Sequence, residues 1–312
     1  MYEIDLELPN DLDGDLFSAI SQGLSDQLWC RRNPYGMSRN EELSYSWEAF
    51  CEIIKHRCRV FFLDESHDRS LLTPSEVLGT IFEYAENIGL IRTLSRDNTK
   101  FFRARLQRPA EILENVLQLG PPPASAAKQN RMSPAGIVMM YGSEDSETAL
   151  AETIEKEGIY AVGEFVIERD AIILDLAELP ETPSIFYEVP DSMEYDPRQN
   201  LIFLHEIADE ISRPIARDDR VHVEYVPTQV VTEFLRTVAI SNGSRIDGIR
   251  YRSSRRGDGS SLVLFADQTN LVMPENLQDS SYKFYRDRWI RLVDKQDYEI
   301  TNLCFDYDVR PV

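Results

Sequence analysis

Apolar residues in the first hundred positions recur at the spacing of amphipathic helices. Between Asp11 and Leu28 they fall close to the period of about 3.6 residues that marks one helix face. The segment Ser38-Arg39-Asn40-Glu41 has the pattern of a capping box and precedes a second apolar stripe. Thr73-Pro74-Ser75-Glu76 is a stronger start signal, because the threonine can cap, the proline suits the first helical position and the glutamate closes the box. We therefore expect a helical unit of about three elements.

The pattern changes near Phe101, where short β-branched and apolar runs begin. These runs predict strands, at Ile137–Tyr141, Tyr160–Ile167, Ala171–Leu174, Gly248–Tyr251 and Ser261–Phe265. Helical patterns lie between them, at Ser146–Lys156, Gln199–Ala208 and Thr228–Val238. Strands and helices without strict alternation favour an α+β fold over a doubly wound sheet. We expect a helical N-terminal domain over residues 1–98 and a mixed α/β domain over residues 99–312.

Composition and charge narrow the classes of partner. The 312 residues include 33 Lys and Arg against 54 Asp and Glu, a net charge of -21, and 42% are hydrophobic, as in a globular protein. The negative excess repels phosphate backbones and anionic membranes, so we expect neither a nucleic-acid nor a membrane partner. No apolar run approaches the roughly 20 residues of a membrane-spanning helix, and Met1 to Asp5 do not begin a signal peptide. These features predict a cytoplasmic protein.

The familiar catalytic and metal-binding motifs are missing from the sequence. The four cysteines do not pair with each other or with the four histidines at the spacing of zinc ligands, so we expect reduced thiols and no metal. There is no phosphate-binding glycine loop, nucleophile elbow or His-Glu-x-x-His motif. Arg198 with His205, and Arg217 with His222, have the loose spacing of some ribonuclease pairs, but the acidic background opposes RNA binding.

Arginine clusters stand out against that acidic background. Arg103 and Arg105 share one face of an extended segment, Arg131 follows a proline-rich loop, and four arginines with two serines crowd residues 250–256. A guanidinium group can donate two parallel hydrogen bonds to the oxygens of a phosphate, and serine hydroxyls add further donors. The clusters therefore indicate a site for a phosphorylated small molecule.

These clusters belong to a longer ordered series of short motifs that covers about residues 101–270. The series consists of Phe102–Arg105, Arg131–Gly136, Met140–Tyr141, Thr148–Glu152, Tyr225–Gln229 and Gly248–Ser254. In this order it resembles the RES-domain family, named for its Arg-Glu-Ser signature and known mostly as toxins of bacterial toxin–antitoxin pairs. The segment Tyr45–Phe50 resembles, more weakly, the helical HEPN/RES-type N-terminal region that is fused to RES in one branch of the family.

The resemblance implies an ADP-ribosyltransferase-like fold that binds NAD as its substrate and breaks the nicotinamide–ribose bond. Arg103 and Arg131 would be pocket arginines, Tyr141 would pack on nicotinamide or ribose, Glu152 would be the catalytic carboxylate, and Ser253 the signature serine. Further NAD-binding residues would be Arg105, Arg252 and Ser254. Arg103 could exchange roles with Arg105, and Ser253 with Ser254. Where an asparagine often follows the family's serine, this chain has Ser260-Ser261.

Several alternatives stay open at this level. Water as acceptor gives an NAD glycohydrolase, phosphate gives a phosphorylase, and a macromolecule gives ADP-ribosyl or pyrophosphoryl transfer; a non-catalytic NAD or ADP-ribose-binding module is a further reading. Taken singly, Arg103 and Arg105 could form surface salt bridges, Glu152 could belong to a solvated acidic face, and the arginines at 250–256 could neutralise carboxylates. We expect an antitoxin protein to cover the cleft. The N-terminal helices would serve as a homodimer surface or a regulatory lid.

Overall fold

The computed structural model describes residues 37–60, 70–109, 111–184, 186, 197–213, 221–274 and 287–301. The helix predicted between Asp11 and Leu28 lies outside these residues, as do Cys30 and Cys304.

Eight of the described strands form one mixed sheet in the order β1-β5-β8-β9-β3-β2-β4-β10. Their bounds are β1 (Ile91–Leu94), β2 (Lys100–Leu106), β3 (Met140–Ser143), β4 (Gly158–Ile167), β5 (Ala171–Asp175), β8 (Gly248–Arg252), β9 (Ser260–Leu264) and β10 (Ile290–Ile300). Within this sheet β5 and β8 pair in parallel, and the other neighbours are antiparallel. The short strands β6 (Ile240–Ser241) and β7 (Ser244–Arg245) form a separate hairpin. The strands predicted from apolar runs are confirmed, although β3 begins at Met140 rather than Ile137.

The longer described helices are α2 (Arg39–His56), α3 (Pro74–Asn87), α6 (Pro197–Ser212) and α8 (Val226–Thr237). Shorter ones are α4 (Val116–Leu119), α5 (Ser146–Thr153) and α7 (Val221–Glu224), with 3-10 turns η1 (Ala124–Ala126) and η2 (Gln268–Asn270). The capping boxes of Ser38 with Glu41 and of Thr73 with Glu76 are both formed. These helices, together with the mixed sheet, confirm the predicted α+β class.

Helix α5 ends earlier than its sequence pattern predicts, at Thr153 rather than Lys156. The backbone turns extended at Ile154, and the hydroxyl group of buried Tyr160 accepts hydrogen bonds from the next two amides, of Glu155 at 3.3 Å and Lys156 at 3.5 Å. The same hydroxyl donates to the Lys156 carbonyl at 2.8 Å. Tyr160 thus satisfies backbone groups that would otherwise continue the helix.

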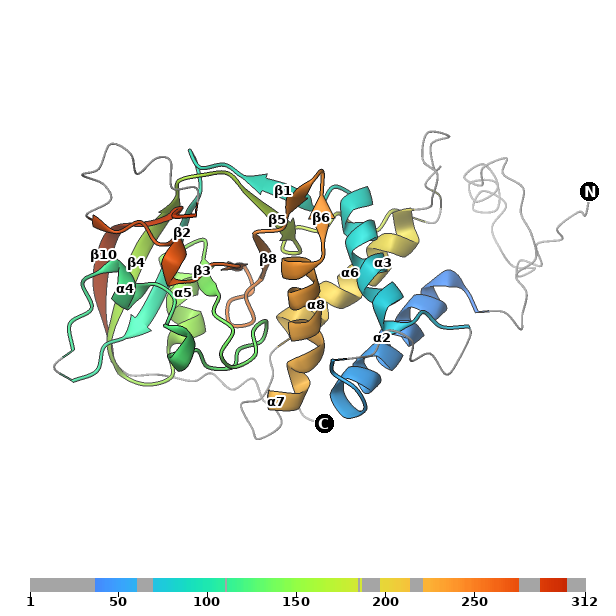
Figure 1. Ribbon diagram of the computed structural model, residues 1–312, viewed down its shortest axis with the longest axis horizontal. Helices are drawn as coiled ribbons and strands as arrows, with labels where there is room; N and C mark the ends of the chain where they lie inside the picture. The colour runs from blue at the N-terminus through green and yellow to red at the C-terminus, as the bar shows by residue number, and fades with distance from the viewer. Residues whose placement is uncertain are drawn as a thin grey trace, which may run out of the picture.

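Helices α2, α3, α6 and α8 gather on one side of the molecule, away from β2, β4 and β10 (Figure 1). They share one hydrophobic core with strands of the central sheet, through residues such as Phe50, Ile81, Leu204, Ile249 and Val263. Along β9, Val263 faces these helices, whereas Leu262 and Leu264 face a second core with Phe101 and Phe165. The described helices before residue 98 therefore pack directly on later elements; the division of the chain at that residue stays a prediction.

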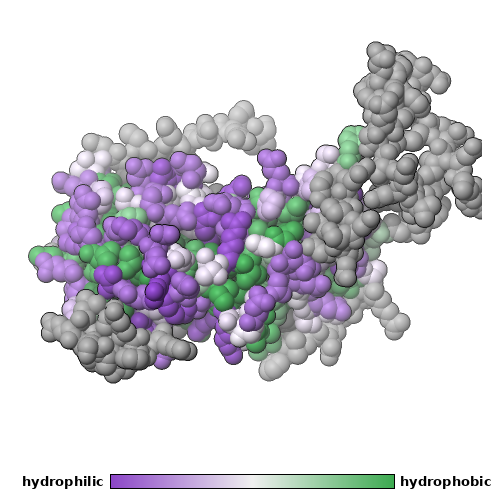
Figure 2. All heavy atoms as spheres, turned by 90° about the horizontal axis from the view of Figure 1, so that it is seen from above, coloured by the Kyte–Doolittle hydropathy of each residue, from purple (hydrophilic) through white to green (hydrophobic). Residues whose placement is uncertain are grey.

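The described residues on one face of the molecule are mostly polar. Hydrophilic residues cover most of the described part of the face in Figure 2, with apolar residues in small scattered groups. Among the described helices, none combines the length and the apolar character needed to cross a membrane.

Candidate active site

The central sheet separates between β2 and β3. Strand β2 pairs with β4 along its whole length but meets β3 only at the pair Phe102↔Ser143. Gly142 lies at this contact, where a β-carbon would come within 2.6 Å of the Phe101 ring. Beyond Phe102, the other edge of β2 has no strand partner among the described residues, and a cleft begins there.

The cleft has a volume of about 1040 Å³, at the upper end of the range for ligand sites, and its lining includes residues of β2, β3 and α5 together with Tyr225 and Tyr251. The predicted site residues that line it are Arg103, Arg105, Arg131, Tyr141, Glu152 and Ser254. Five arginines and three glutamates face it, so the lining is positive although the whole chain carries -21. This reversal of sign suits an anionic ligand.

Arg103 bridges the separation in the sheet. Its Nη1 donates to the Tyr141 carbonyl on β3 at 2.8 Å, while its Nε is buried and has no hydrogen-bond partner among the described residues. Burial and the neighbouring charge of Arg105 lower the pKa of Arg103 to about 10. The group stays protonated at neutral pH, and it retains an unused donor.

Two other arginines of the predicted site, Arg105 and Arg131, are also held by main-chain carbonyls. Arg105 donates through Nη1 to the carbonyl of Gln118, and Arg131 through Nη1 to the carbonyl of Ile211. The Arg131 guanidinium also lies over the Tyr225 ring, 5.7 Å from its centre. In the part of the chain that the structure describes, neither arginine forms an ion pair with a carboxylate.

Two tyrosines form a neutral wall of the cleft. The Tyr141 hydroxyl lies 2.9 Å from Ser133 Oγ, and burial raises the pKa of Tyr141 to about 12. Burial, together with the negative charge of Glu152, raises the pKa of Tyr251 as well. Both phenols therefore stay protonated near neutral pH.

Glu152 is held at the end of α5 by the turn after β8. Its Oε1 accepts a hydrogen bond from Ser253 Oγ at 2.5 Å and another from the backbone N–H of Ser254 at 3.1 Å. Ser253 is buried and accepts the backbone N–H groups of Arg255 at 3.2 Å and Arg256 at 3.1 Å, which direct its own proton toward Glu152. Ser253 thus lies behind the carboxylate rather than at the surface of the cleft.

The motif around Tyr225 positions the loop that carries Arg131. Thr228 Oγ1 donates to the Arg131 carbonyl at 2.6 Å, and Gln229 Nε2 donates to the Asn130 carbonyl at 2.8 Å. Pro227 lies in the first turn of α8, where its missing N–H leaves no helical bond unmade. The spacing of this motif therefore reflects a contact between two distant segments.

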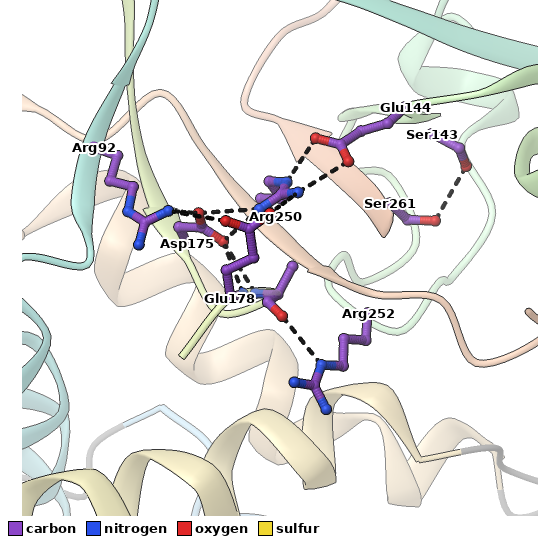
Figure 3. A network of polar contacts seen from close by, with 9 residues as sticks. Arg92, Ser143, Glu144, Asp175, Glu178, Arg250, Arg252 and Ser261 are labelled. Carbon is purple, nitrogen blue, oxygen red and sulfur yellow. Dashed lines mark hydrogen bonds and ion pairs between the residues drawn. The ribbon is translucent and has the colours of Figure 1, made fainter. Parts of the chain in front are cut away.

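Arg252, which we predict to bind NAD, does not line the cleft. Side chains alternate along β8, so Tyr251 faces the cleft while Arg250 and Arg252 face the other way. Arg252 Nε donates to the Ala177 carbonyl at 3.1 Å (Figure 3). Arg250 lies between Glu144 and Asp175 and donates to both, as well as to Glu178 (Figure 3).

Other cleft residues were not selected from the sequence. They include Tyr225, Tyr251, Arg255, Ser143 and Ser261. The Oγ atoms of Ser143 and Ser261 lie 3.1 Å apart, across the β3–β9 pair Ser143↔Ser261. Period-two alternation along β8 and β9 would have selected Tyr251 and Ser261 once the cleft-facing side was known. Among the described residues no group of histidine, cysteine and carboxylate side chains could hold a metal ion.

Comparison with protein families shows which family this chain belongs to. A family model described as RES domain matches residues 105–287, which is more than half of the chain. The chain belongs to the RES-domain family. A second model, HEPN/RES N-terminal domain 1, matches residues 2–68. Comparison with curated proteins gave no significant match, and neither did comparison with solved structures.

Membership of the RES family supports a general NAD-related toxin role within toxin–antitoxin systems. The RES match begins at Arg105, so it includes only the second arginine of the pair on β2. Arg131, Tyr141, Glu152 and Ser253 all lie inside it.

Proposed function

We propose that this RES protein is an NAD-consuming toxin that cleaves the bond between nicotinamide and ribose. The observation that carries the proposal is that Glu152 lines the same cleft as arginines whose charges no carboxylate of the described chain neutralises. Elsewhere the described arginines often pair with acids, as Arg250 and Arg291 do. A diphosphate would supply the missing counter-charge.

The carbonyl contacts orient the cleft arginines without cancelling their charge. A guanidinium has five N–H donors, and the contacts described for Arg103, Arg105 and Arg131 each use a single nitrogen. The remaining donors suit the oxygens of a pyrophosphate bidentately. Held in this way, the ligand would present its ribose to Glu152 in a fixed geometry.

Glu152 has one oxygen available for chemistry. Oε1 is engaged by Ser253 and Ser254, whereas Oε2 has no hydrogen bond to the described residues. When the C–N bond to nicotinamide breaks, its electron pair goes to the ring nitrogen and nicotinamide leaves as a neutral molecule. The ribose carbon becomes electron-poor, and the carboxylate stabilises this charge.

The new bond forms between the ribose carbon and the acceptor oxygen. With water as acceptor, the lost proton passes to Glu152 or to solvent, and the product is ADP-ribose. With inorganic phosphate, a phosphate oxygen adds to the same carbon. We propose both as acceptors to be tested, with NAD as substrate and no metal.

Purified protein incubated with NAD tests the proposal, with and without phosphate, with nicotinamide and the ribosyl product separated by chromatography and weighed by mass spectrometry. We expect nicotinamide release that falls at least about 100-fold in Glu152→Gln, since that change removes the stabilising charge. Glu233→Gln, an exposed glutamate on α8, is the matched control and retains activity.

Each other outcome has a clear meaning. An ADP-ribose product identifies a glycohydrolase, and a phosphorylated one a phosphorylase. ADP-ribose mass added to a protein acceptor would identify a transferase and overturn water and phosphate as the acceptors. Tight NAD binding without turnover would identify a binding module and overturn the proposal. In cells, expression should arrest growth and lower NAD in the wild type but not in Glu152→Gln. We also propose an antitoxin whose binding over the cleft stops NAD loss, and the same assay tests it on the isolated complex.

A further inference from the structure

We propose that Arg256, which does not line the cleft, is a positioning residue that fixes helix α5 and thereby Glu152. Together with Ser253 and Ser254 it belongs to one turn after β8, here named the 253–256 turn. The kinetic part of this inference rests on the proposed function, and the structural part does not.

The start of α5 is bound by Arg256. Its Nη1 lies 2.7 Å from Asp145 Oδ1, and its Nη2 lies 3.0 Å from Glu147 Oε2. Asp145 is the N-cap of α5 and accepts the Thr148 backbone N–H at 2.7 Å. Arg256 Nη1 also lies 3.3 Å from Thr148 Oγ1. One guanidinium therefore contacts the cap and the first turn of the helix.

The end of α5 is bound by the same turn. Ser253 and the Ser254 amide hold Glu152 Oε1, as described above. An eight-residue helix is about 12 Å long, so contacts at both ends restrain its translation and its tilt. Gly259 brings the following backbone against the helix: a β-carbon there would lie 2.3 Å from Thr148 Oγ1.

The segment before the cap is anchored as well. Arg250 Nε and Nη2 donate to the two oxygens of Glu144 at 2.6 and 2.9 Å, and Nη1 donates to buried Asp175 at 3.1 Å (Figure 3). Burial alone would lower the pKa of Arg250, but its bonds to Glu144 and Glu178 raise it above the ordinary value. Arginines of β8 and its turn thus hold two successive residues, Glu144 and Asp145.

These contacts add to a small apolar one, in which Ala149 and Leu150 pack with residues of β2 and β4. Helices this short are not stable in isolation, and α5 buries only Thr148, Ala149 and Leu150. A misplacement of about 1 Å at a catalytic group can cost about 100-fold in rate. The geometry therefore assigns the arginines at 250 and 256 to the placement of the catalytic helix rather than to the ligand.

Arg256→Ala tests the inference, with Arg291→Ala as matched control. Both side chains are about one-third exposed and ion-paired. Arg256 pairs with Asp145, Glu147 and Asp258, whereas Arg291, on β10, pairs with Glu168, which directly follows β4. Arg250 is left intact because it is one of two arginines, with Arg92, that pair with buried Asp175, so its loss would disturb a second charge cluster. Each variant is measured for kcat, KM for NAD, melting temperature and hydrogen exchange of residues 146–153.

We expect Arg256→Ala to lower kcat about 10- to 100-fold with KM changed less than about threefold, and to speed exchange in α5. Arg256→Lys, which keeps the charge but not the fork, should recover part of kcat. A raised KM at unchanged kcat would overturn the inference by making Arg256 a ligand contact, and so would rates equal to those of Arg291→Ala. If the wild type does not consume NAD, the proposed function fails, yet unchanged exchange in α5 would still refute the positioning role on its own.

Discussion

The hydrogen bond between Ser253 and Glu152 gives the sharpest single test of the site. Ser253→Ala removes a donor 2.5 Å from a carboxylate oxygen and leaves the Ser254 amide as the remaining partner of Oε1. A hydrogen bond to a charged group contributes about 1.5–3 kcal/mol. If that loss appears in the transition state, kcat falls by about 10- to 100-fold.

The same substitution also affects stability. The backbone amides of Arg255 and Arg256 lose their part-buried acceptor, and an amide left unsatisfied costs about 1–3 kcal/mol unless water reaches it. Thermal unfolding measured beside the kinetics separates the two effects. We expect kcat to fall in protein that is still folded at the assay temperature, with KM for NAD little changed.

Ser254→Ala is the informative comparison. Ser254 binds Glu152 through its backbone N–H, which alanine keeps, so its loss in kcat should be about tenfold smaller than that of Ser253→Ala. This pair of variants decides which of the two adjacent serines acts as the signature serine. Equal losses in both, or a melting temperature that falls in Ser253→Ala while kcat is unchanged, would refute the reasoning.

Three further predictions follow from local geometry. Gly259→Ala places a β-carbon 2.8 Å from Thr148 Cγ2, so urea denaturation should show a loss of about 1–3 kcal/mol, and an unchanged midpoint would contradict the close approach. Burial would raise the pKa of Asp145, but hydrogen bonds from Thr148 and the charge of Arg256 lower it below 3.8 overall. The ionised carboxylate therefore contributes its full stabilisation above pH 3.8 and loses it as the pH falls through the lower pKa of the folded state. The difference in unfolding free energy between wild type and Asp145→Asn should accordingly narrow in acid. Phe50→Ala should cost about 3–5 kcal/mol and lower one shared unfolding transition, because Phe50 lies in the core common to helices and sheet; two separate transitions would contradict that shared core.

The features that sequence could predict are local ones. A capping box joins residues three apart, so Ser38 with Glu41 and Thr73 with Glu76 can be read directly. Strand β10 escapes the same reading, because Asp294, Lys295, Asp297 and Glu299 interrupt its apolar pattern. Its partner β4 lies more than a hundred residues earlier, and edge strands commonly carry such charges.

The site was predicted where motif residues touch the cleft directly and missed where orientation decides. Glu152 and Arg131 were found through their motifs, and both line the cleft. Arg252 lies outside the cleft because its neighbour Tyr251 occupies the cleft-facing side of β8. Alternation fixes that these two side chains diverge, but only the tertiary packing of β8 decides which of them faces the ligand.

The partners of the arginines explain why an acidic chain carries a cationic cleft. An arginine beside carboxylates is neutralised in place: the bonds of Arg250 to Glu144 and Glu178 hold its pKa above the ordinary value. Arg103 has no such neighbour among the described residues. Burial and the charge of Arg105 lower its pKa to about 10, which means that they destabilise its protonated form. A bound phosphate would stabilise the protonated form, and the free energy released on pairing would favour binding.

The contacts that orient these arginines leave no trace in the sequence. Arg103, Arg105 and Arg131 donate to the carbonyls of Tyr141, Gln118 and Ile211, and every residue type has such a carbonyl. The backbone around an arginine therefore decides whether carboxylates or carbonyls hold it, which is why clusters at 103–105 and 250–256 that look alike in the sequence have different partners in the structure.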